Sequence, residues 1–480
     1  MAIALGGTLT AISLLLAGTL PIFLDEAVSI NEASLATVRD IVGAIRTWDI
    51  GKPPLYFVAL HYWLAMTGPG ELLARLPSVL GAAASAALMY VMGKHLFGVR
   101  TALLALALLA VNPEFLIITS WARMYSAFFL LSLASTLLLA RVHAVDRPGL
   151  WVGAYGTCLC ALLYLHYFAV LVIAVHVAYA AICLPQARWR VLAGLAVACA
   201  GFAPWLTTMI RQVSNGVDVV WTAAPSVWTL LGTLKHLAGS AAAACILLPA
   251  AAWGVLALCR DAGLSGVGRD GGGLARVLQD TRQGQALALA LIWLTLPPLL
   301  MFAVGRFVTP IWGFQYLLFV LPALLWLAAR GIDEIWRRRG RTIALGVLVA
   351  LVPLEAHATV MKAAGRPDWR PVARQVAALR GTGDLVVVEN AAWRLVYGYY
   401  DRGARVFGAW PGYIEVLRDR SRLLPGDGTA GRVWVVLEEK DGTRVSAALR
   451  PVMTSGNLSV YQFTRDAVRV REDGLVIGFP

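Results

Sequence analysis

Two adjacent carboxylates, Asp25 and Glu26, follow the first long apolar run of the chain at residues 4–22. An unpartnered carboxylate at the end of a membrane helix is costly. A carboxylate beside the bilayer can instead act as a general base on a hydroxyl group, or help to hold a divalent cation such as Mg²⁺ or Mn²⁺. We therefore predict that Asp25 and Glu26 are catalytic, and that both are candidate ligands of such a cation. The alternative is a solvated loop without chemistry.

Basic side chains on the same side of the membrane form a second candidate group. Arg75 begins the second long apolar run, Arg123 lies in SWARMYSA, and Arg306 precedes TPIWGFQYLL. Guanidinium groups near a carboxylate-rich loop can bind a phosphate bidentately, or they can simply reach the lipid headgroups. Lys235 lies inside an apolar run and is a candidate for the same phosphate site, unless residues 226–236 lie along the interface.

Aromatic side chains gather near the predicted outer ends of the membrane segments, among them Tyr125, His166, Tyr167 and Tyr316. Most residues of this kind form a belt at the level of the headgroups. Because aromatic rings also stack on sugar rings, some of them are candidates for the wall of a substrate cavity. His166 is either such a wall residue or a buried histidine with satisfied hydrogen bonds.

The composition indicates that membrane helices position these candidates. Hydrophobic residues make up 59% of the 480 residues and charged residues only 14%, whereas soluble proteins are about half apolar and a quarter charged. Repeated runs of about 20 apolar residues predict a polytopic membrane protein. The net charge of +13 then reflects Lys and Arg in cytoplasmic loops, and no nucleic-acid-binding signature accompanies it. The six cysteines imply no disulfide framework.

We predict about eleven membrane-spanning helices from the apolar runs. The N-terminal run is expected to remain as the first helix, because it lacks a basic region and a clear cleavage site. The run at 227–258 is long enough to include a surface helix, and the short segment 53–66 favours a re-entrant or interfacial helix. The runs lie near residues 4–22, 72–92, 101–119, 124–141, 150–165, 167–184, 191–210, 227–258, 284–304, 313–329 and 342–358.

Loop charge predicts the orientation of these helices. With the N-terminus inside, the inner loops carry 15 Lys and Arg residues and the outer loops between spans carry seven. This bias agrees with the positive-inside rule. It places Asp25, the loop at 23–71 and the C-terminal tail outside.

Beyond the membrane segments the character of the chain changes. Residues 359–480 predict a soluble α/β domain, with a helix in PDWRPVARQVAALR, a buried strand at 385–388 and further strands in RVWVVLEE and LSVYQFT. We therefore expect two domains. The membrane domain at 1–358 carries the outer loop 23–71, and the soluble domain occupies 359–480.

An ordered set of segments links these features to a known family. The set is LDEAVSINEAS, PPLYFVALHYWLAMTGPGELLARLPSVLG, GKHLFG, WARMYSAFFLLSLAS, YLHYFAVL and QYLLFVLPALLWLAARGI. Over nearly the whole chain it resembles the family 39 membrane glycosyltransferases of bacteria, the dolichyl-phosphate-mannose-protein mannosyltransferase type of the GT-C superfamily. It resembles most the lipopolysaccharide-core galacturonosyltransferases, and the lipid A aminoarabinose transferases are relatives.

This resemblance implies a GT-C fold and an enzyme that takes a monosaccharide from a polyprenyl-phosphate carrier. The acceptor is implied to be a lipid, a cell-envelope glycan or a protein hydroxyl on the periplasmic side of the bacterial inner membrane. The family's first outer loop carries an acidic motif, which is Asp25-Glu26 here. The residues above and the resemblance together predict a substrate cavity lined by Glu71, Tyr56, Tyr125, His166, Tyr167, Gln315 and Tyr316.

The chain departs from the family pattern at three places. Lys52 precedes a Pro-Pro pair where relatives commonly have histidine, and the segment before Arg123 lacks a glutamate that relatives commonly carry. Gln315 stands where relatives commonly have an arginine. We expect Arg306 or Lys52 to take over phosphate binding from that arginine.

Two other classes of function are compatible with a polytopic membrane protein. A lipid or solute transporter predicts polar residues facing one another deep in several spans, whereas the middle of the spans is almost wholly Leu, Ala and Val. A receptor or scaffold leaves the acidic motif and the clustered arginines unexplained. The glycosyltransferase reading therefore explains more of the residues.

Overall fold

The chain is described from a computed structural model. It comprises two compact units: the first is Met1–Gly18 with Glu32–Ala363, and the second is Thr19–Asn31 with Ala364–Pro480. The segment that carries Asp25 and Glu26 therefore belongs with the C-terminal residues. The structure describes residues 1–47, 51–144, 148–214, 223–264, 272–388, 393–408, 432–438, 451–464, 468–471 and 474–477.

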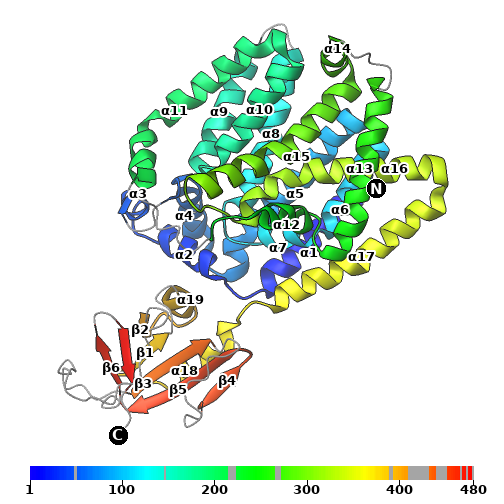
Figure 1. The fold of residues 1–480 in the computed structure, drawn as a ribbon. Coiled ribbons are helices and arrows are strands. Elements are labelled where there is room, and N and C mark those ends of the chain that lie inside the picture. Colours follow the sequence, from blue (N-terminus) through cyan, green and yellow to red (C-terminus); the bar gives the residue numbers. More distant parts are fainter. Residues whose placement is uncertain are drawn as a thin grey trace. The chain divides into compact units, whose positions relative to one another are not determined.

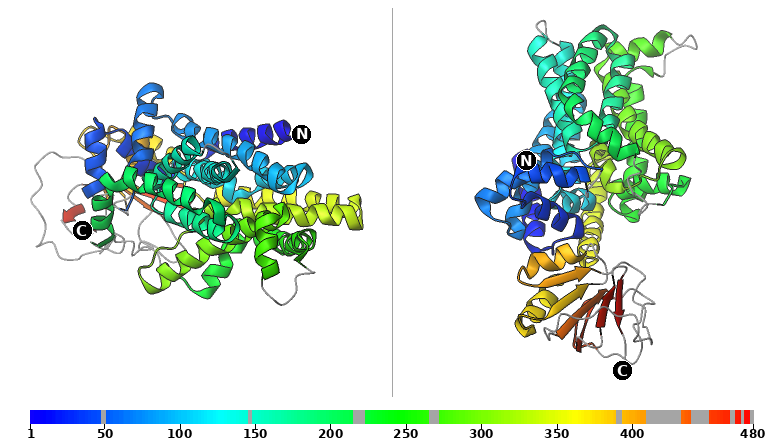
Figure 2. Two further views of the ribbon diagram at one scale, coloured as in Figure 1. Left: turned by 90° about the horizontal axis from the view of Figure 1, so that it is seen from above. Right: turned by 90° about the vertical axis from the view of Figure 1, so that its left-hand side faces the viewer.

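The first unit is a bundle of apolar helices, which Figures 1 and 2 show packed side by side. Among its described residues, eight helices are long and apolar enough to cross a membrane, or nine if one bent helix pair is a single span. The eight include α1 (Ala2–Thr19), α5 (Glu71–Phe97), α8 (Tyr125–Ala144), α13 (Ala241–Asp261) and α15 (Arg282–Phe307). The other three are Pro185–Ser214, which contains α11 (Arg188–Ser214), Phe314–Arg338, which contains most of α16 (Leu321–Arg339), and the segment that begins with α17 (Arg341–Ala364).

All of the predicted membrane runs are helical, but the predicted number of eleven spans is not confirmed. Two apolar helices, α9 (Gly149–Leu165) and α10 (Ala169–Cys183), have only 17 and 15 residues. The run at 227–258 divides into a short helix, α12 (Val227–Leu237), and the long α13. The segment 53–66 forms α4 (Leu55–Thr67), which is also too short for a simple span.

The bent pair consists of α6 (Val99–Val111) and α7 (Pro113–Thr119), whose axes meet at 62°. A proline disfavours the helical conformation of the residue before it, so the break falls at Asn112. The Asn112 side chain then accepts a hydrogen bond from the Phe115 N–H (3.0 Å) and donates one to the Leu237 carbonyl (3.0 Å). These bonds satisfy backbone groups that the break exposes, and they connect α7 to the end of α12.

The central helix α16 packs backbone to backbone against α13. A Cβ atom placed on Gly331 would lie 1.8 Å from the Ala250 carbonyl oxygen, and one on Gly254 would lie 2.0 Å from that of Leu327. Small residues allow this close approach, which is a common way for membrane helices to associate. The charged residues near the end of α16 are thereby held beside the end of α13.

The second unit contains a five-stranded sheet with the order β2-β1-β3-β5-β4. Strands β1 and β2, and likewise β1 and β3, pair in parallel, whereas β5 is antiparallel to β3 and β4. The predicted strands at 385–388, RVWVVLEE and LSVYQFT are confirmed as β1, β3 and β5. The elements are α2 (Leu24–Ala33), α18 (Trp369–Leu379), α19 (Trp393–Tyr400), β1 (Leu385–Val388), β2 (Arg405–Gly408), β3 (Arg432–Glu438), β4 (Met453–Ser455), β5 (Leu458–Thr464), and the hairpin β6 (Val468–Arg471) with β7 (Gly474–Ile477).

A buried carboxylate, Asp384, ties the start of this sheet together. It accepts hydrogen bonds from the Trp434 indole (3.0 Å) and from the backbone N–H groups of Arg432 (2.8 Å) and Gly381 (2.9 Å). Burial by itself raises the pKa of Asp384, but these donors and the Arg432 charge outweigh it and lower the pKa below the usual value. The ionised carboxylate is therefore part of the folded structure.

We expect the Asp384→Asn substitution to lower the stability of the sheet, and most strongly at neutral pH. Because the folded pKa is depressed, the stabilisation is present above the unfolded pKa of about 3.9 and is lost as the pH falls through the folded value. Hydrogen exchange of residues 432–438 in the full-length protein, corrected for intrinsic rates, measures the effect between pH 3 and 7. If the variant were less stable than the wild type by the same amount at pH 3 and at pH 7, this explanation would be wrong.

Candidate active site

The acidic motif lies in the first turn of α2, where the positive end of the helix dipole favours carboxylates. The Glu26 carboxylate accepts a hydrogen bond from the Phe23 N–H (3.1 Å), the residue immediately before the helix. This is half of a capping box. The local sequence therefore explains why the helix begins directly before Asp25.

Asp25 and Glu26 differ in their surroundings. Glu26 is fully buried and forms an ion pair with Arg366, whose guanidinium lies 3.7 Å from the Glu26 Oε2 and over the Phe23 ring. Asp25 is half-buried, and neighbouring residues of a helix do not face the same direction. The structure thus gives Glu26 a role in positioning the helix, while Asp25 presents its carboxylate from another face.

Residues 19–23 are held by the start of the C-terminal segment. The Ile22 N–H donates to the Tyr400 hydroxyl (2.8 Å), and Arg370 donates to the Thr19 carbonyl (2.9 Å). The Phe23 and Trp393 rings meet edge to face with their centres 6.4 Å apart. Trp393 in turn stacks on Trp369, with 5.4 Å between the ring centres. Sequence reasoning missed these contacts, although the charged and aromatic segment GRPDWR is a visible signal.

A second group of predicted residues meets inside the first unit. Arg123 is 5% exposed, and its guanidinium lies 5.9 Å from the centre of the Tyr125 ring. The rings of Tyr125, His166 and Tyr316 lie 5.3–6.4 Å from one another. Phe168, which was not predicted, stacks on His166 with the ring centres 5.0 Å apart. We call Arg123, Tyr125, His166, Phe168 and Tyr316 the aromatic cluster.

His166 is held neutral in this cluster. It lies in the turn between α9 and α10, where burial lowers its pKa to about 3 and the charges of Arg123 and Lys52 act in the same direction. The Phe168 N–H donates to His166 Nδ1 (3.2 Å). The neutral ring therefore carries its proton on Nε2, which makes it a hydrogen-bond donor.

Arg75, Tyr167 and Arg306 have other surroundings. The Arg75 side chain is buried and donates to the Ala17 carbonyl (2.8 Å) near the end of α1. The Tyr167 hydroxyl donates to Gln212 (2.6 Å) and accepts from the Trp205 indole (2.9 Å), so it is bonded to α11. Arg306 is exposed in the last turn of α15.

The remaining predicted residues are distributed over three elements. Lys52 lies with its ammonium 5.8 Å from the centre of the Phe57 ring, and the neighbouring Tyr56 is buried. Glu71 is half-buried in the first turn of α5, and Gln315 is half-buried in the 3₁₀ helix η3 (Phe314–Val320). The charge of Lys52, like that of Arg123, lowers the pKa of His166, which indicates that Lys52 lies near the aromatic cluster.

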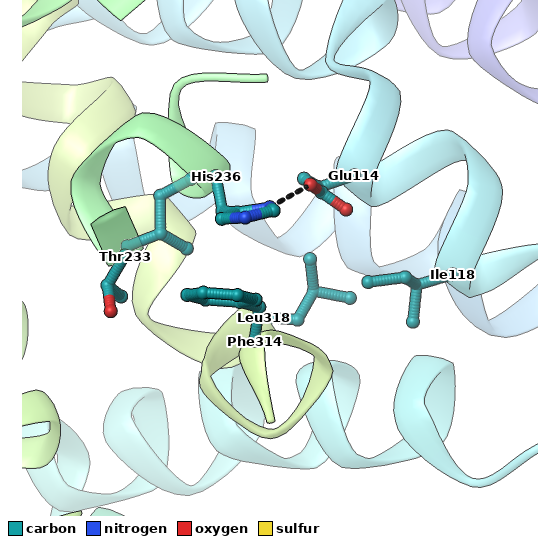
Figure 3. A pocket seen from close by; sticks show the side chains of 7 residues that line it. Glu114, Ile118, Thr233, His236, Phe314 and Leu318 are labelled. Atoms are coloured by element: carbon teal, nitrogen blue, oxygen red, sulfur yellow. Dashed lines mark hydrogen bonds and ion pairs between the residues drawn. The ribbon is translucent and has the colours of Figure 1, made fainter. Parts of the chain in front are cut away.

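Lys235 and His236, the charged pair of the long apolar run, lie in the last turn of α12. Lys235 is exposed. His236 donates from Nδ1 to Glu114 at the helix break (2.9 Å) and stacks on Phe314, so that it lies between the carboxylate and the ring in the small pocket of Figure 3. Lys362 of α17 donates to the same Glu114 oxygen. Glu114 and Lys362 were not predicted.

A second buried carboxylate, Glu355 of α17, lies near this group. A Cβ atom on Gly239 would be 2.4 Å from Glu355 Oε2, and the Gly239 φ of +97° also favours glycine. Among the described residues Glu355 Oε2 has no hydrogen-bond partner. The group formed by Glu114, His236, Lys362 and Glu355 therefore contains one satisfied carboxylate and one that is not.

The donor set for the predicted divalent cation is incomplete in the described residues. No group of three or more His, Cys, Asp and Glu side chains is placed there to hold a metal ion. Glu26 is engaged with Arg366, and Asp25 points from a different face of the helix. The residues present therefore do not fit a resident metal, and no step below is routed through one.

Comparisons with known proteins agree with this architecture. Residues 51–208 match the family model described as dolichyl-phosphate-mannose-protein mannosyltransferase. The whole chain is similar to ArnT from Cupriavidus metallidurans bound to undecaprenyl phosphate, with 13% identity, 96% of this chain and 97% of ArnT covered, and a TM-score of 0.61. The apo form of ArnT gives 14% identity, the same coverage and a TM-score of 0.62.

The chain has the GT-C glycosyltransferase fold. A more distant similarity links it to the oligosaccharyltransferase AglB from Archaeoglobus fulgidus in complex with an inhibitory peptide and a dolichol-phosphate, with 10% identity, 91% and 69% of the two chains covered, and a TM-score of 0.52. A search of the curated proteins finds no match. The predicted GT-C fold and the multi-pass membrane character are confirmed.

We expect Arg366→Gln to loosen α2. The change leaves Glu26 buried without its ion-pair partner, and breaking a buried pair costs about 3–5 kcal/mol. Hydrogen exchange in residues 24–33 should become faster in the full-length variant. The matched control is Arg374→Gln, because Arg374 is exposed on α18. Equal hydrogen-exchange rates of residues 24–33 in the two variants would contradict a structural role for the Glu26–Arg366 ion pair.

We also expect Glu114 and Glu355 to respond differently to neutralisation. Glu114→Gln weakens the hydrogen bonds that the Glu114 carboxylate accepts from His236 and Lys362, each worth about 1.5–3 kcal/mol, and so lowers thermal stability in detergent. Glu355→Gln replaces a buried carboxyl group whose second oxygen has no partner in the described residues, so stability is unchanged or raised. A similar loss in both variants would refute the distinction.

Proposed function

We propose that this protein is an integral-membrane glycosyltransferase that moves a monosaccharide from a polyprenyl-phosphate carrier to an acceptor on the periplasmic side of the bacterial inner membrane. The observation that carries the proposal is the shared fold over 96% of this chain and 97% of ArnT, a protein whose structure holds undecaprenyl phosphate. The mannosyltransferase family model supports the same class of reaction. The acceptor is a lipid, a glycan or a protein hydroxyl.

The proposed reaction is a single inverting displacement. Asp25 takes the proton of the acceptor hydroxyl as the hydroxyl oxygen attacks the anomeric carbon of the sugar. The bond between that carbon and the phosphate oxygen breaks, and its electron pair leaves with the polyprenyl phosphate. Asp25 suits the role of general base because Glu26 is already committed to Arg366.

Positive charge is needed where the phosphate departs. Arg123 and Lys52 supply it, because both are near enough to His166 to lower its pKa. Arg123 is buried, and a guanidinium in a low-dielectric setting stabilises a developing phosphate charge strongly. Arg75, Arg306 and Lys235 remain candidates for weaker contacts with the phosphate.

The aromatic cluster suits the sugar. The rings of Tyr125 and Tyr316 offer flat surfaces for a pyranose, and the neutral His166 offers an Nε2–H donor for a sugar hydroxyl or carboxylate. Gln315, Tyr56, Tyr167 and Glu71 complete the predicted cavity. A histidine that stays neutral keeps its donor role across the physiological pH range.

The test is transfer by the purified full-length protein in lipid. Radiolabelled polyprenyl-phosphate sugars serve as donors and a membrane extract as acceptor, with and without EDTA. Asp25→Asn should lower the transfer rate by about 10²–10⁴-fold. Asp40→Asn is the matched control, because Asp40 is an exposed aspartate in the first turn of the next helix, α3 (Val38–Thr47).

Each outcome of this assay has a consequence. Full transfer by a folded Asp25→Asn variant would refute the base assignment. Loss of transfer in EDTA would show that a metal takes part. If the protein moved the carrier lipid across the membrane without any sugar transfer, the proposed function would be wrong and a lipid transporter would be the better description.

A further inference from the structure

A cluster of arginines lies at the other end of the α6–α7 pair from Arg123. It is formed where α13 and α16 end and where α6 and α17 begin, all in the first unit (Figure 1). We call it the arginine surface, and the loop charges predict that it faces the cytoplasm. Its members are Arg100, Arg260, Arg337, Arg338 and Arg341, of which Arg100 and Arg341 lie over the Trp336 ring.

Two buried carboxylates hold these arginines in place. Asp333 is 0% exposed and pairs with Arg337 (2.7 Å) and Arg100 (3.4 Å). Glu334 is 4% exposed and pairs with Arg260 (2.7 Å) and also with Arg338. Ion pairs of this kind fix the planar guanidinium groups before any ligand arrives.

The network carries an excess of positive charge. In the described part of the chain, four of these arginines (Arg100, Arg260, Arg337 and Arg338) and the buried Arg330 pair with three carboxylates, those of Asp261, Asp333 and Glu334. The side chains of Arg100, Arg337, Arg338 and Arg260 are still 44–54% exposed. Each guanidinium has five N–H donors, so donors remain for a ligand after the carboxylates are satisfied.

Two arginines of this surface contact an aromatic residue, Trp336. The guanidinium groups of Arg100 and Arg341 each lie 5.6 Å from the centre of the half-buried Trp336 ring. Tryptophan is enriched at the level of the lipid headgroups, where its ring is partly apolar and partly wet. The position of Trp336 therefore indicates that the arginines lie at headgroup depth.

We propose that the arginine surface binds the phosphate of an anionic phospholipid headgroup in the adjacent leaflet. Arginine matches phosphate geometry bidentately, and basic pockets between membrane helices at the cytoplasmic face are suited to anionic headgroups. Such a lipid would bridge the ends of α6, α13, α16 and α17. This site is distinct from the one proposed for the polyprenyl-phosphate donor, which uses Arg123.

The test is native mass spectrometry of the full-length protein in detergent with added phosphatidylglycerol or phosphatidylcholine. The wild type should bind phosphatidylglycerol roughly tenfold more tightly than phosphatidylcholine. The double variant Arg337→Gln/Arg338→Gln should lose most of this preference. Arg341→Gln should weaken it too, and it is the second variant because its described contact is with Trp336 rather than with a carboxylate.

The matched control is Arg188→Gln. Arg188 is exposed on the predicted inner side and lies 5.4 Å from the centre of the Trp189 ring, but it has no carboxylate network among the described residues. It should keep the wild-type preference. Equal binding of the two lipids, or an unchanged preference in both arginine variants, would overturn the proposal. So would full displacement of phosphatidylglycerol by inorganic phosphate at equal concentration, since the ligand would then be free phosphate.

Discussion

The cost of placing a charge in hydrocarbon governs where polar groups lie in the membrane unit. Helix α16 shows the effect within one element, because its first nine residues are uncharged and its last ten contain two acids and four arginines. The two acids are buried and pair with arginines, most of which reach outward, so the buried negative charge is compensated at the end of the bundle. The same cost explains why Glu114 and Lys362 pair where α6 is interrupted.

The acidic motif shows how one residue prepares the position of another. Glu26 caps its own helix and pairs with Arg366, and both roles fix the turn that carries Asp25. A general base works best when its position is already set before the substrate binds. The buried ion pair thus links the stability of α2 to the chemistry proposed for Asp25, and it assigns different tasks to two neighbouring carboxylates.

Interruptions of the helices supply the polar surroundings that continuous helices lack. At Asn112 the backbone turns, the Asn112 side chain satisfies freed groups, and Glu114 follows directly in α7. At the turn between α9 and α10, His166 leaves the helix and joins Arg123 and Tyr316. In both places a short irregular segment brings ionisable groups to helices that are otherwise apolar, which membrane proteins tolerate where the segment is buried in protein.

The sequence by itself determined the class of protein, the positions of its apolar helices and three strands of the sheet. These follow from local physics, since about 20 apolar residues span a bilayer and short β-branched runs favour strands. It also singled out Asp25, Arg123, Tyr125, His166 and Tyr316. Only the tertiary structure decided the partners, because Glu26 meets Arg366 and Glu114 meets Lys362 across hundreds of residues. Charge pairing depends on distance in space, and local sequence patterns do not encode which distant helix arrives beside a given carboxylate.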